Sequence, residues 1–95
     1  LIRTALGSGA APDQLYLAAG RLRYNGGEYR RALANYRAAL DAQPESAAAT
    51  LGVGLAARKL GDNRAAAGAL TSYLRLAPHA PEQAELRAWI QKHGG

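Results

Sequence analysis

The chain contains no cysteine, phenylalanine or methionine, and it has one tryptophan and two histidines. Without cysteine it can form neither a disulfide nor a thiolate metal site, although this absence leaves its cellular compartment open. The apolar runs are far shorter than the ~20 residues that a membrane-spanning helix requires, so we expect no membrane span. His79 and His93 have no carboxylate nearby at the spacing of a metal site or a catalytic triad. We therefore expect neither a metal nor any other cofactor.

Other groups that could carry chemistry are also few. Glu82 and Glu85 are three residues apart, where they favour the positive end of a helix rather than form a catalytic pair. The sequence Gly52-Val53-Gly54 lacks the Lys and Ser/Thr that follow the glycines of a phosphate-binding loop. We therefore expect that the protein is not an enzyme.

Alanine and leucine are abundant instead, with 23 and 14 copies. Both are strong helix formers because neither loses much side-chain freedom in a helix. Alanine also allows helices to approach each other closely. The composition therefore predicts a tightly packed all-α protein, and 95 residues are enough for one small domain. The richness in Ala, Arg and Gly indicates a bacterial source with a GC-rich genome.

Positive charge predominates, with a net charge of +5 at pH 7. A basic stretch of this kind could contact a nucleic acid, an acidic protein or another anionic surface, or it could be the solvated face of an Arg-rich helix. Nucleic acid is disfavoured, because no block of basic residues is interleaved with stacking aromatic residues. The stretch contains Arg21, Arg23, Arg30, Arg31 and Arg37, opposed only by Glu28.

A repeat of 34 residues runs through the sequence. Shifting the chain by this offset superimposes glycines, a proline and a small residue at places where a helical hairpin has steric requirements. The identical pairs are Leu17/Leu51, Gly20/Gly54, Gly27/Gly61, Arg30/Arg64, Ala32/Ala66, Leu40/Leu74 and Pro44/Pro78.

Two helical hairpins and a final helix follow from this pattern. The glycine-containing segments 25–27 and 61–63 are typical of turns, while Pro44 and Pro78 cannot continue the helices before them. The predicted helices cover about residues 13–25, 29–42, 47–60, 63–76 and 81–92.

The sequence resembles the tetratricopeptide repeat family, in which aromatic, small and proline residues recur at set positions on two antiparallel helices. The first repeat fits this pattern with Tyr16, Ala19, Gly20, Ala32, Tyr36 and Pro44. The second fits it with Val53, Gly54, Ala66, Leu70 and Pro78 and departs from it at Thr50 and Tyr73, as the first does at Arg23. Small residues such as Gly20 and Ala32 let the helices cross closely, and Tyr16 and Tyr36 are expected to fill the remaining volume.

The resemblance implies an all-α, right-handed α-solenoid of helix-turn-helix repeats, which forms a single domain over residues 1–95. Full repeats are expected at residues 11–44 and 45–78. Residues 81–93 are interpreted as a C-terminal capping helix, because Arg87 fits badly where a third repeat needs a small apolar residue. Trp89 or Ile90 is expected to contact the second hairpin.

The same offset aligns residues 1–6 with residues 35–40. Residues 1–9 are therefore interpreted as the remnant of a preceding repeat helix, and the alternative is an ordinary N-terminal extension. A remnant would leave Ile2 and Leu6 without a partner hairpin. Self-association through this N-terminal edge is then expected, because exposed apolar patches recruit partners.

In this family the first helix of each hairpin lines a concave groove. The resemblance therefore implies a non-catalytic protein–protein interaction module that binds a peptide or protein segment, as part of a longer protein or assembly. Apolar and cationic side chains share the groove stripe, together with Ala48, which suits an acidic partner or a free carboxylate. The predicted protein-binding residues are Gln14, Leu17, Arg21, Tyr24, Asn25, Leu51, Leu55, Arg58 and Lys59.

Other interpretations remain open at this point. The leucines of the stripe could pack against neighbouring helices while its cations are merely solvated. The domain could then be a structural or self-associating spacer, or the Arg cluster could contact an anion or nucleic acid. Chaperone-binding members of the family use a clamp of Lys and Asn residues, which Leu17, Arg21 and Gly52 replace here, so binding of chaperone tails is not supported.

Overall fold

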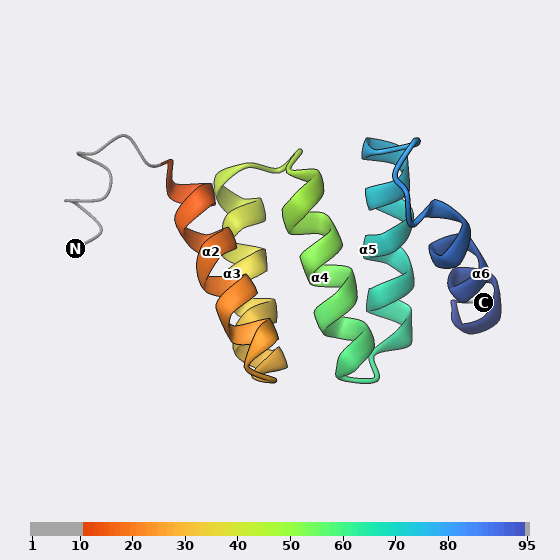
Figure 1. The fold of residues 1–95 in the computed structure, drawn as a ribbon, viewed down its shortest axis with the longest axis horizontal. Helices are drawn as coiled ribbons and strands as arrows, with labels where there is room; N and C mark the ends of the chain where they lie inside the picture. The colour runs from red at the N-terminus through yellow and green to blue at the C-terminus, as the bar shows by residue number, and fades with distance from the viewer. Residues whose placement is uncertain (1–10, 95) are drawn as a thin grey trace.

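A computed structural model describes residues 11–94 (Figure 1). Within this range the chain consists of helices and the turns between them. The first four helices closely match their predicted ranges, whereas the last begins at Gln83 because residues 81 and 82 belong to a turn. The helices are α2 (Pro12–Asn25), α3 (Tyr29–Ala42), α4 (Ala47–Lys59), α5 (Asn63–Leu76) and α6 (Gln83–His93).

The two hairpin turns are built on glycines 34 residues apart. Gly27 and Gly61 adopt φ angles of 79° and 80°, in the left-handed region where any side chain would be strained. The second turn also caps α5, because the Asp62 carboxylate accepts a hydrogen bond of 3.2 Å from the backbone N–H of Ala65. Ser46 caps α4 in the same way.

The helices form two antiparallel hairpins, α2/α3 and α4/α5, which stack side by side along the molecule (Figure 1). The second helix of the first hairpin, α3, packs against α4, and the two first helices, α2 and α4, also contact each other. At the C-terminal end α6 packs against α5. The predicted all-α helical-repeat solenoid is confirmed.

The two hairpins are joined around the ring of Tyr36 on α3, which is 5% exposed. A Cβ atom added to Gly20 of α2 would lie 2.7 Å from this ring, and one added to Gly52 of α4 would lie 2.5 Å from it. The ring is therefore held between glycines of different hairpins, where no larger residue fits without movement. The sequence predicted this steric role for Gly20 but not for Gly52.

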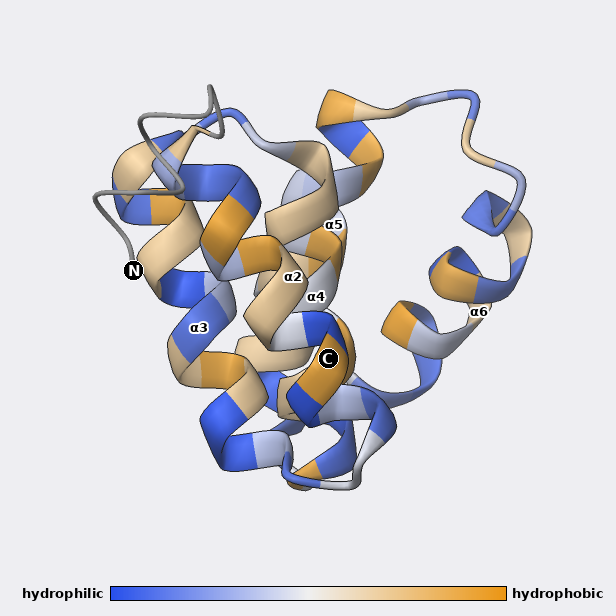
Figure 2. Ribbon diagram, turned by 60° about the vertical axis from the view of Figure 1, so that its left-hand side comes forward, coloured by the Kyte–Doolittle hydropathy of each residue, from blue (hydrophilic) through white to orange (hydrophobic). Residues whose placement is uncertain are grey.

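A second core cluster joins α5 to α6. Leu86 is the best-buried residue of α6, at 1% exposure. The most hydrophobic parts of this helix lie on the side turned toward the rest of the molecule (Figure 2). Trp89 and Ile90 lie partly buried at the edge of the cluster, so the expected contact with the second hairpin is present. The buried members of the cluster are Leu70, Tyr73, Leu74, Ala80 and Leu86.

The start of α6 is also tied to α5 by a polar contact. The Tyr73 hydroxyl donates a hydrogen bond to the Glu82 carboxylate, which belongs to the N-cap residue of α6. This hydrogen bond, together with burial, raises the pKa of Tyr73 to about 12. The large Tyr73 side chain is thus accommodated because α6 begins at Gln83, two residues later than the 34-residue offset from Ala47 of α4 would place it.

Tyr16 does not fill the core as expected, because its side chain is 38% exposed. Thr50 occupies the equivalent position on α4 and is buried. Position 16 therefore belongs to the side of α2 against which a preceding hairpin would pack. The interpretation of residues 1–9 as a repeat remnant, and the self-association expected from Ile2 and Leu6, concern residues outside the described part of the chain.

Candidate functional site

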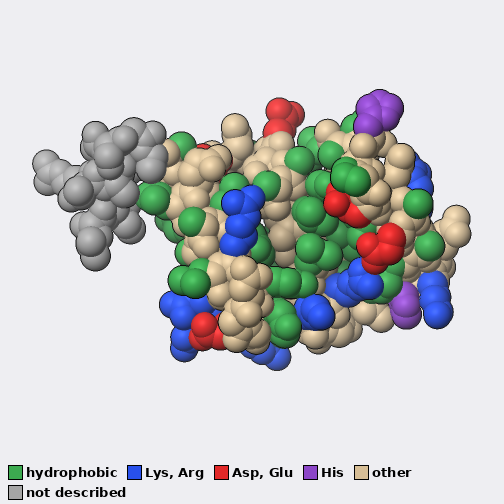
Figure 3. Space-filling model, in the orientation of Figure 1, with side chains coloured by type: hydrophobic (Ala, Val, Ile, Leu, Met, Phe, Trp, Pro, Cys, Tyr) green, Lys and Arg blue, Asp and Glu red, His purple; other side chains and the backbone are tan. Residues whose placement is uncertain are grey.

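The residues predicted to bind a partner lie on α2 and α4, and we term the surface that these two helices form the α2/α4 face. Figure 3 shows hydrophobic side chains gathered over α4, with cationic groups on either side of them. Gln14, Arg21, Asn25, Ala48 and Lys59 are exposed, whereas Tyr24, Leu51, Leu55 and Arg58 are partly buried.

Leu17 does not belong to the accessible part of this face. It is 4% exposed and packs in the same core cluster as Tyr36. Together with Gly20 it forms the inner stripe of α2, which lies directly beside the stripe of Gln14 and Arg21. The alternative that some leucines pack against neighbouring helices therefore holds for Leu17. It also holds in part for Leu51, which packs at the edge of the second core cluster.

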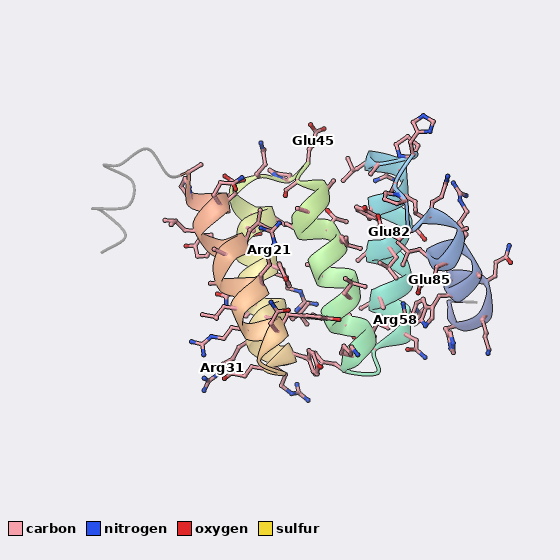
Figure 4. The ribbon with its side chains drawn as sticks, in the orientation of Figure 1. Arg21, Arg31, Glu45, Arg58, Glu82 and Glu85 are labelled. Carbon is pink, nitrogen blue, oxygen red and sulfur yellow. The ribbon has the colours of Figure 1, made fainter. Side chains whose placement is uncertain are left out.

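Arg21 lies between α2 and α4 in the view of Figure 4. It is exposed and forms no ion pair with any residue of the described range. Its positive charge also acts on Tyr36: burial raises the pKa of that hydroxyl, and Arg21 opposes the rise. Arg21 is therefore close to the junction of the two hairpins, and no carboxylate of residues 11–94 forms an ion pair with it.

Tyr24 and Lys59, near the C-terminal ends of α2 and α4, both contact Tyr29, a residue that sequence reasoning missed. The ring of Tyr29, at the start of α3, lies edge-on to Tyr24 with 5.3 Å between the ring centroids. The Lys59 ammonium lies 5.9 Å from the centroid of the Tyr29 ring. Lys59 nevertheless remains exposed, because a cation–π contact at this distance leaves the rest of the ammonium in water.

Arg58 is occupied within the protein. Its guanidinium lies 3.1 Å from the Glu85 carboxylate and 5.1 Å from the centroid of the Trp89 ring, both on α6 (Figure 4). The Arg58 side chain is 34% exposed. Arg58 therefore helps to hold α6 against α4, which the sequence did not indicate because Glu85 follows it by 27 residues.

Some arginines of the basic stretch are paired with Glu28, whereas others are exposed. Arg23 and Arg31 both donate hydrogen bonds to the Glu28 carboxylate, at 3.1 and 3.0 Å. The hydrogen bond from Arg23 is the main reason that the pKa of Glu28 is lowered, and Arg31 adds to the effect. Arg30 and Arg37 are exposed on α3.

The α2/α4 face is a surface rather than a pocket. A hollow of about 410 Å³ lies between α5 and α6, and another of about 470 Å³ lies between the ends of α3, α4 and α5. Neither is lined by a predicted binding residue. Residues 11–94 contain no group of three side chains arranged to hold a metal ion. Over the same range, the helices are all too short or too polar to cross a membrane.

The family profile described as a tetratricopeptide repeat matches residues 17–81, which is more than half of the chain. The chain belongs to the tetratricopeptide repeat family. Tetratricopeptide repeats generally mediate protein–protein interactions and are generally non-catalytic. A search of curated proteins found no match to the sequence.

The matched tetratricopeptide repeat segment runs from within α2 to the turn before α6. It includes most of the first hairpin, all of the second and the Tyr36 junction, but not α6. The bacterial origin indicated by the composition stays a prediction.

Proposed function

We propose that this tetratricopeptide repeat chain binds a protein segment on its α2/α4 face, and that Arg21 recognises an acidic group of that segment. The observation that carries the proposal is the exposed position of Arg21, without a carboxylate partner in residues 11–94. A charge-assisted hydrogen bond to a carboxylate contributes about 1.5–3 kcal/mol. One such contact therefore accounts for a change in affinity of roughly tenfold or more.

The apolar part of the same face would contact the body of the segment. Leu51 and Leu55 are partly buried on α4, so each offers some apolar surface. Asn25 and Gln14 are exposed on α2 and can exchange hydrogen bonds with a backbone. A mixed surface of this kind suits an extended segment better than a small molecule, because the two hollows described above lie away from it.

The experiment uses photo-crosslinking from the α2/α4 face, followed by affinity measurement with the captured partner. A photoreactive residue at Asn25 should form adducts with a partner, whereas the same residue at Arg30 on α3 should not. The Arg21→Glu/Lys59→Glu variant should then bind the partner at least about tenfold more weakly. Arg58 is left unchanged, because its substitution would also disturb the contact with α6.

The matched control is Arg30→Glu/Arg37→Glu, which makes the same change of charge at two exposed positions of α3. Equal affinity for all three proteins, with unchanged circular dichroism, would contradict the assignment of the α2/α4 face. A spacer with no binding role would form no adduct from Asn25.

A further inference from the structure

The hollow between α5 and α6 combines an apolar interior with a cationic rim. Leu74 is 7% exposed and Ile90 is partly buried, and both line it. Arg75 and Arg87 line it from the two facing helices and are exposed. Neither arginine forms an ion pair within residues 11–94. The site thus offers apolar surface and two uncompensated positive charges to the same ligand.

The 34-residue offset shows what this hollow corresponds to in the solenoid. Leu74 matches Leu40 of α3, and Arg87 matches Val53 of α4. Between α3 and α4, the equivalent surface is covered by α5, whose Ala69 packs in the cluster that includes Val53 and Leu40. The hollow is therefore the place where the second helix of a third hairpin would pack.

The lining of the hollow differs from that of its counterpart in one respect. Val53 and Ala57 of α4 are buried under α5, at 8% and 1% exposure. Arg87 and Gln91 stand at the same positions of α6 and are exposed. A helix permanently seated there would bury the charge of Arg87, which is unfavourable unless a carboxylate accompanies it. The surface therefore suits a helix that brings its own acidic residues.

We propose that the hollow docks an acidic amphipathic helix of a partner protein, in the place of the second helix of a third hairpin. Apolar side chains of that helix would cover Leu74 and Ile90, and its carboxylates would meet Arg75 and Arg87. A second copy of this chain does not offer such a helix, because no helix within residues 11–94 carries more than one acidic residue. Two copies with a charge of +5 each would also repel one another. The proposal uses none of the residues assigned to the α2/α4 face.

The test uses the 95-residue chain and two synthetic probes. Each is a side-chain-bridged helical peptide of about four turns with leucines at helical spacing, flanked in one peptide by glutamates and in the other by glutamines. The glutamate peptide should shift the backbone amide resonances of Thr71 and Gln91, and its binding should weaken as salt rises. The glutamine peptide should bind about tenfold more weakly or worse.

Charge reversal then identifies the residues. Arg75→Glu/Arg87→Glu should weaken the glutamate peptide by about a hundredfold, and the neutral variant Arg75→Gln/Arg87→Gln by about tenfold. Arg64→Glu is the matched control, because Arg64 is exposed on the same helix and lies roughly 16 Å along it from Arg75. Its affinity should equal that of the unchanged chain. Arg21→Glu/Lys59→Glu should also bind the peptide normally, which separates this proposal from the one for the α2/α4 face.

Several outcomes would overturn the proposal. Equal affinity of the two peptides, no binding of either, or resonance shifts confined to the α2/α4 face would each show that the hollow does not recognise an acidic helix. A dimer that dissociates in the Arg75→Glu/Arg87→Glu variant would show instead that a second copy covers it.

Discussion

At the scale of single residues, the fold depends on glycines at positions where a larger side chain would not fit. The Tyr36 ring touches α2 and α4 only because Gly20 and Gly52 have no Cβ atom there. The same offset relates Tyr36 to Leu70 and Gly52 to Leu86. Where α3 meets α4, a large Tyr36 packs against a glycine. In the core cluster between α5 and α6, two leucines take the equivalent positions.

Gly52→Ala should therefore destabilise the protein, even though alanine favours helices. Its Cβ atom would overlap the Tyr36 ring, which Gly20 holds from the other side. Overpacking of this kind costs about 1–3 kcal/mol, more than the ~1 kcal/mol that alanine contributes to helix stability. Urea unfolding should show a net loss of stability of up to about 2 kcal/mol.

Gly68→Ala is the matched control, since a Cβ atom there meets nothing within 4 Å in the middle of α5. It should stabilise the protein by about 0.5–1 kcal/mol. In a Tyr36→Leu background the cost of Gly52→Ala should shrink, because the smaller side chain leaves room for the methyl group. A stabilising effect of Gly52→Ala in the unchanged protein would contradict the packing around Tyr36.

The hydroxyl of Tyr73 predicts a dependence of stability on alkaline pH. The pKa of this group rises from 10.0 to about 12 in the folded protein, mainly because it donates a hydrogen bond to Glu82. The folded state therefore holds the proton more tightly, and the resulting stability is complete below pH 10 and is lost as pH rises through 12. The loss should amount to roughly 2–3 kcal/mol.

Urea unfolding of the unchanged protein and of Tyr73→Phe, measured from pH 8 to pH 12, would check this expectation. The difference in stability between the two should narrow through the window between about 10 and 12. Tyr29→Phe is a control for general alkaline effects, because its hydroxyl forms no hydrogen bond to another side chain within the described residues. A constant difference across the range would count against the Tyr73–Glu82 contact.

At the scale of elements, α6 is held differently from the helices of the hairpins. It packs one side against α5 through Leu86 and is tied to α4 through Arg58. Arg87, Ala88, Gln91 and Lys92 of this helix are exposed, although Arg87 and Gln91 also line the hollow beside α5. A helix with one apolar and one polar side can close a repeat array, and we propose this capping role for α6.

Leu86→Ala should release α6 more effectively than any change at its surface. Leu86 is 1% exposed within the core cluster, and truncating a buried leucine costs about 2–5 kcal/mol. The fluorescence of Trp89 would report the loss, because the ring moves into water when α6 detaches. Truncation of Trp89 should cost less than the ~3–5 kcal/mol of a core tryptophan, since its side chain is only partly buried.

Lys92→Ala serves as the control on the same helix, because Lys92 is exposed and should change stability by less than about 0.5 kcal/mol. Equal effects of Leu86→Ala and Lys92→Ala would mean that α6 does not anchor to α5.

At the scale of the whole molecule, each element of the solenoid is stabilised by its neighbours along the axis. α6 covers Tyr73 and Leu74, which are 8% and 7% exposed in its presence. Because each element is stabilised by its neighbours, the loss of an end element destabilises the element that precedes it. The junction around Tyr36 lies one hairpin away and does not include α6.

A chain that ends at Pro78 should therefore be less stable by several kcal/mol, of the order of the cost of truncating Leu86. The uncovered Tyr73 and Leu74 should also cause it to associate as its concentration rises. Sedimentation and urea unfolding would measure both effects. A chain lacking only the last two residues keeps all of α6 and should behave like the full chain. A monomeric, equally stable truncated chain would contradict the capping role.

The sequence by itself determined the helices, the hairpin turns and the repeat. These features depend on local requirements: Gly27 and Gly61 supply a positive φ, and Pro44 and Pro78 stop helices, whatever surrounds them. The small residues also predicted that the helices cross closely. Their spacing could not say which side chain fills the room that a small residue leaves, and so the contact of Gly52 with Tyr36 was missed.

Only the tertiary structure decided which stripe of each first helix remains exposed to solvent. Leu17 is separated from Gln14 and Arg21 by only about 40–60° of helical rotation. The amphipathic pattern is too weak to separate Leu17 in the core from Gln14 and Arg21 outside it. It also decided that Arg58 is engaged by α6 while Arg21 is not, because that outcome depends on where a helix 27 residues away along the chain is docked. Helical periodicity predicts how residues are arranged around a single helix. The packing of several helices against one another determines which charged side chains are paired and which stay unpaired.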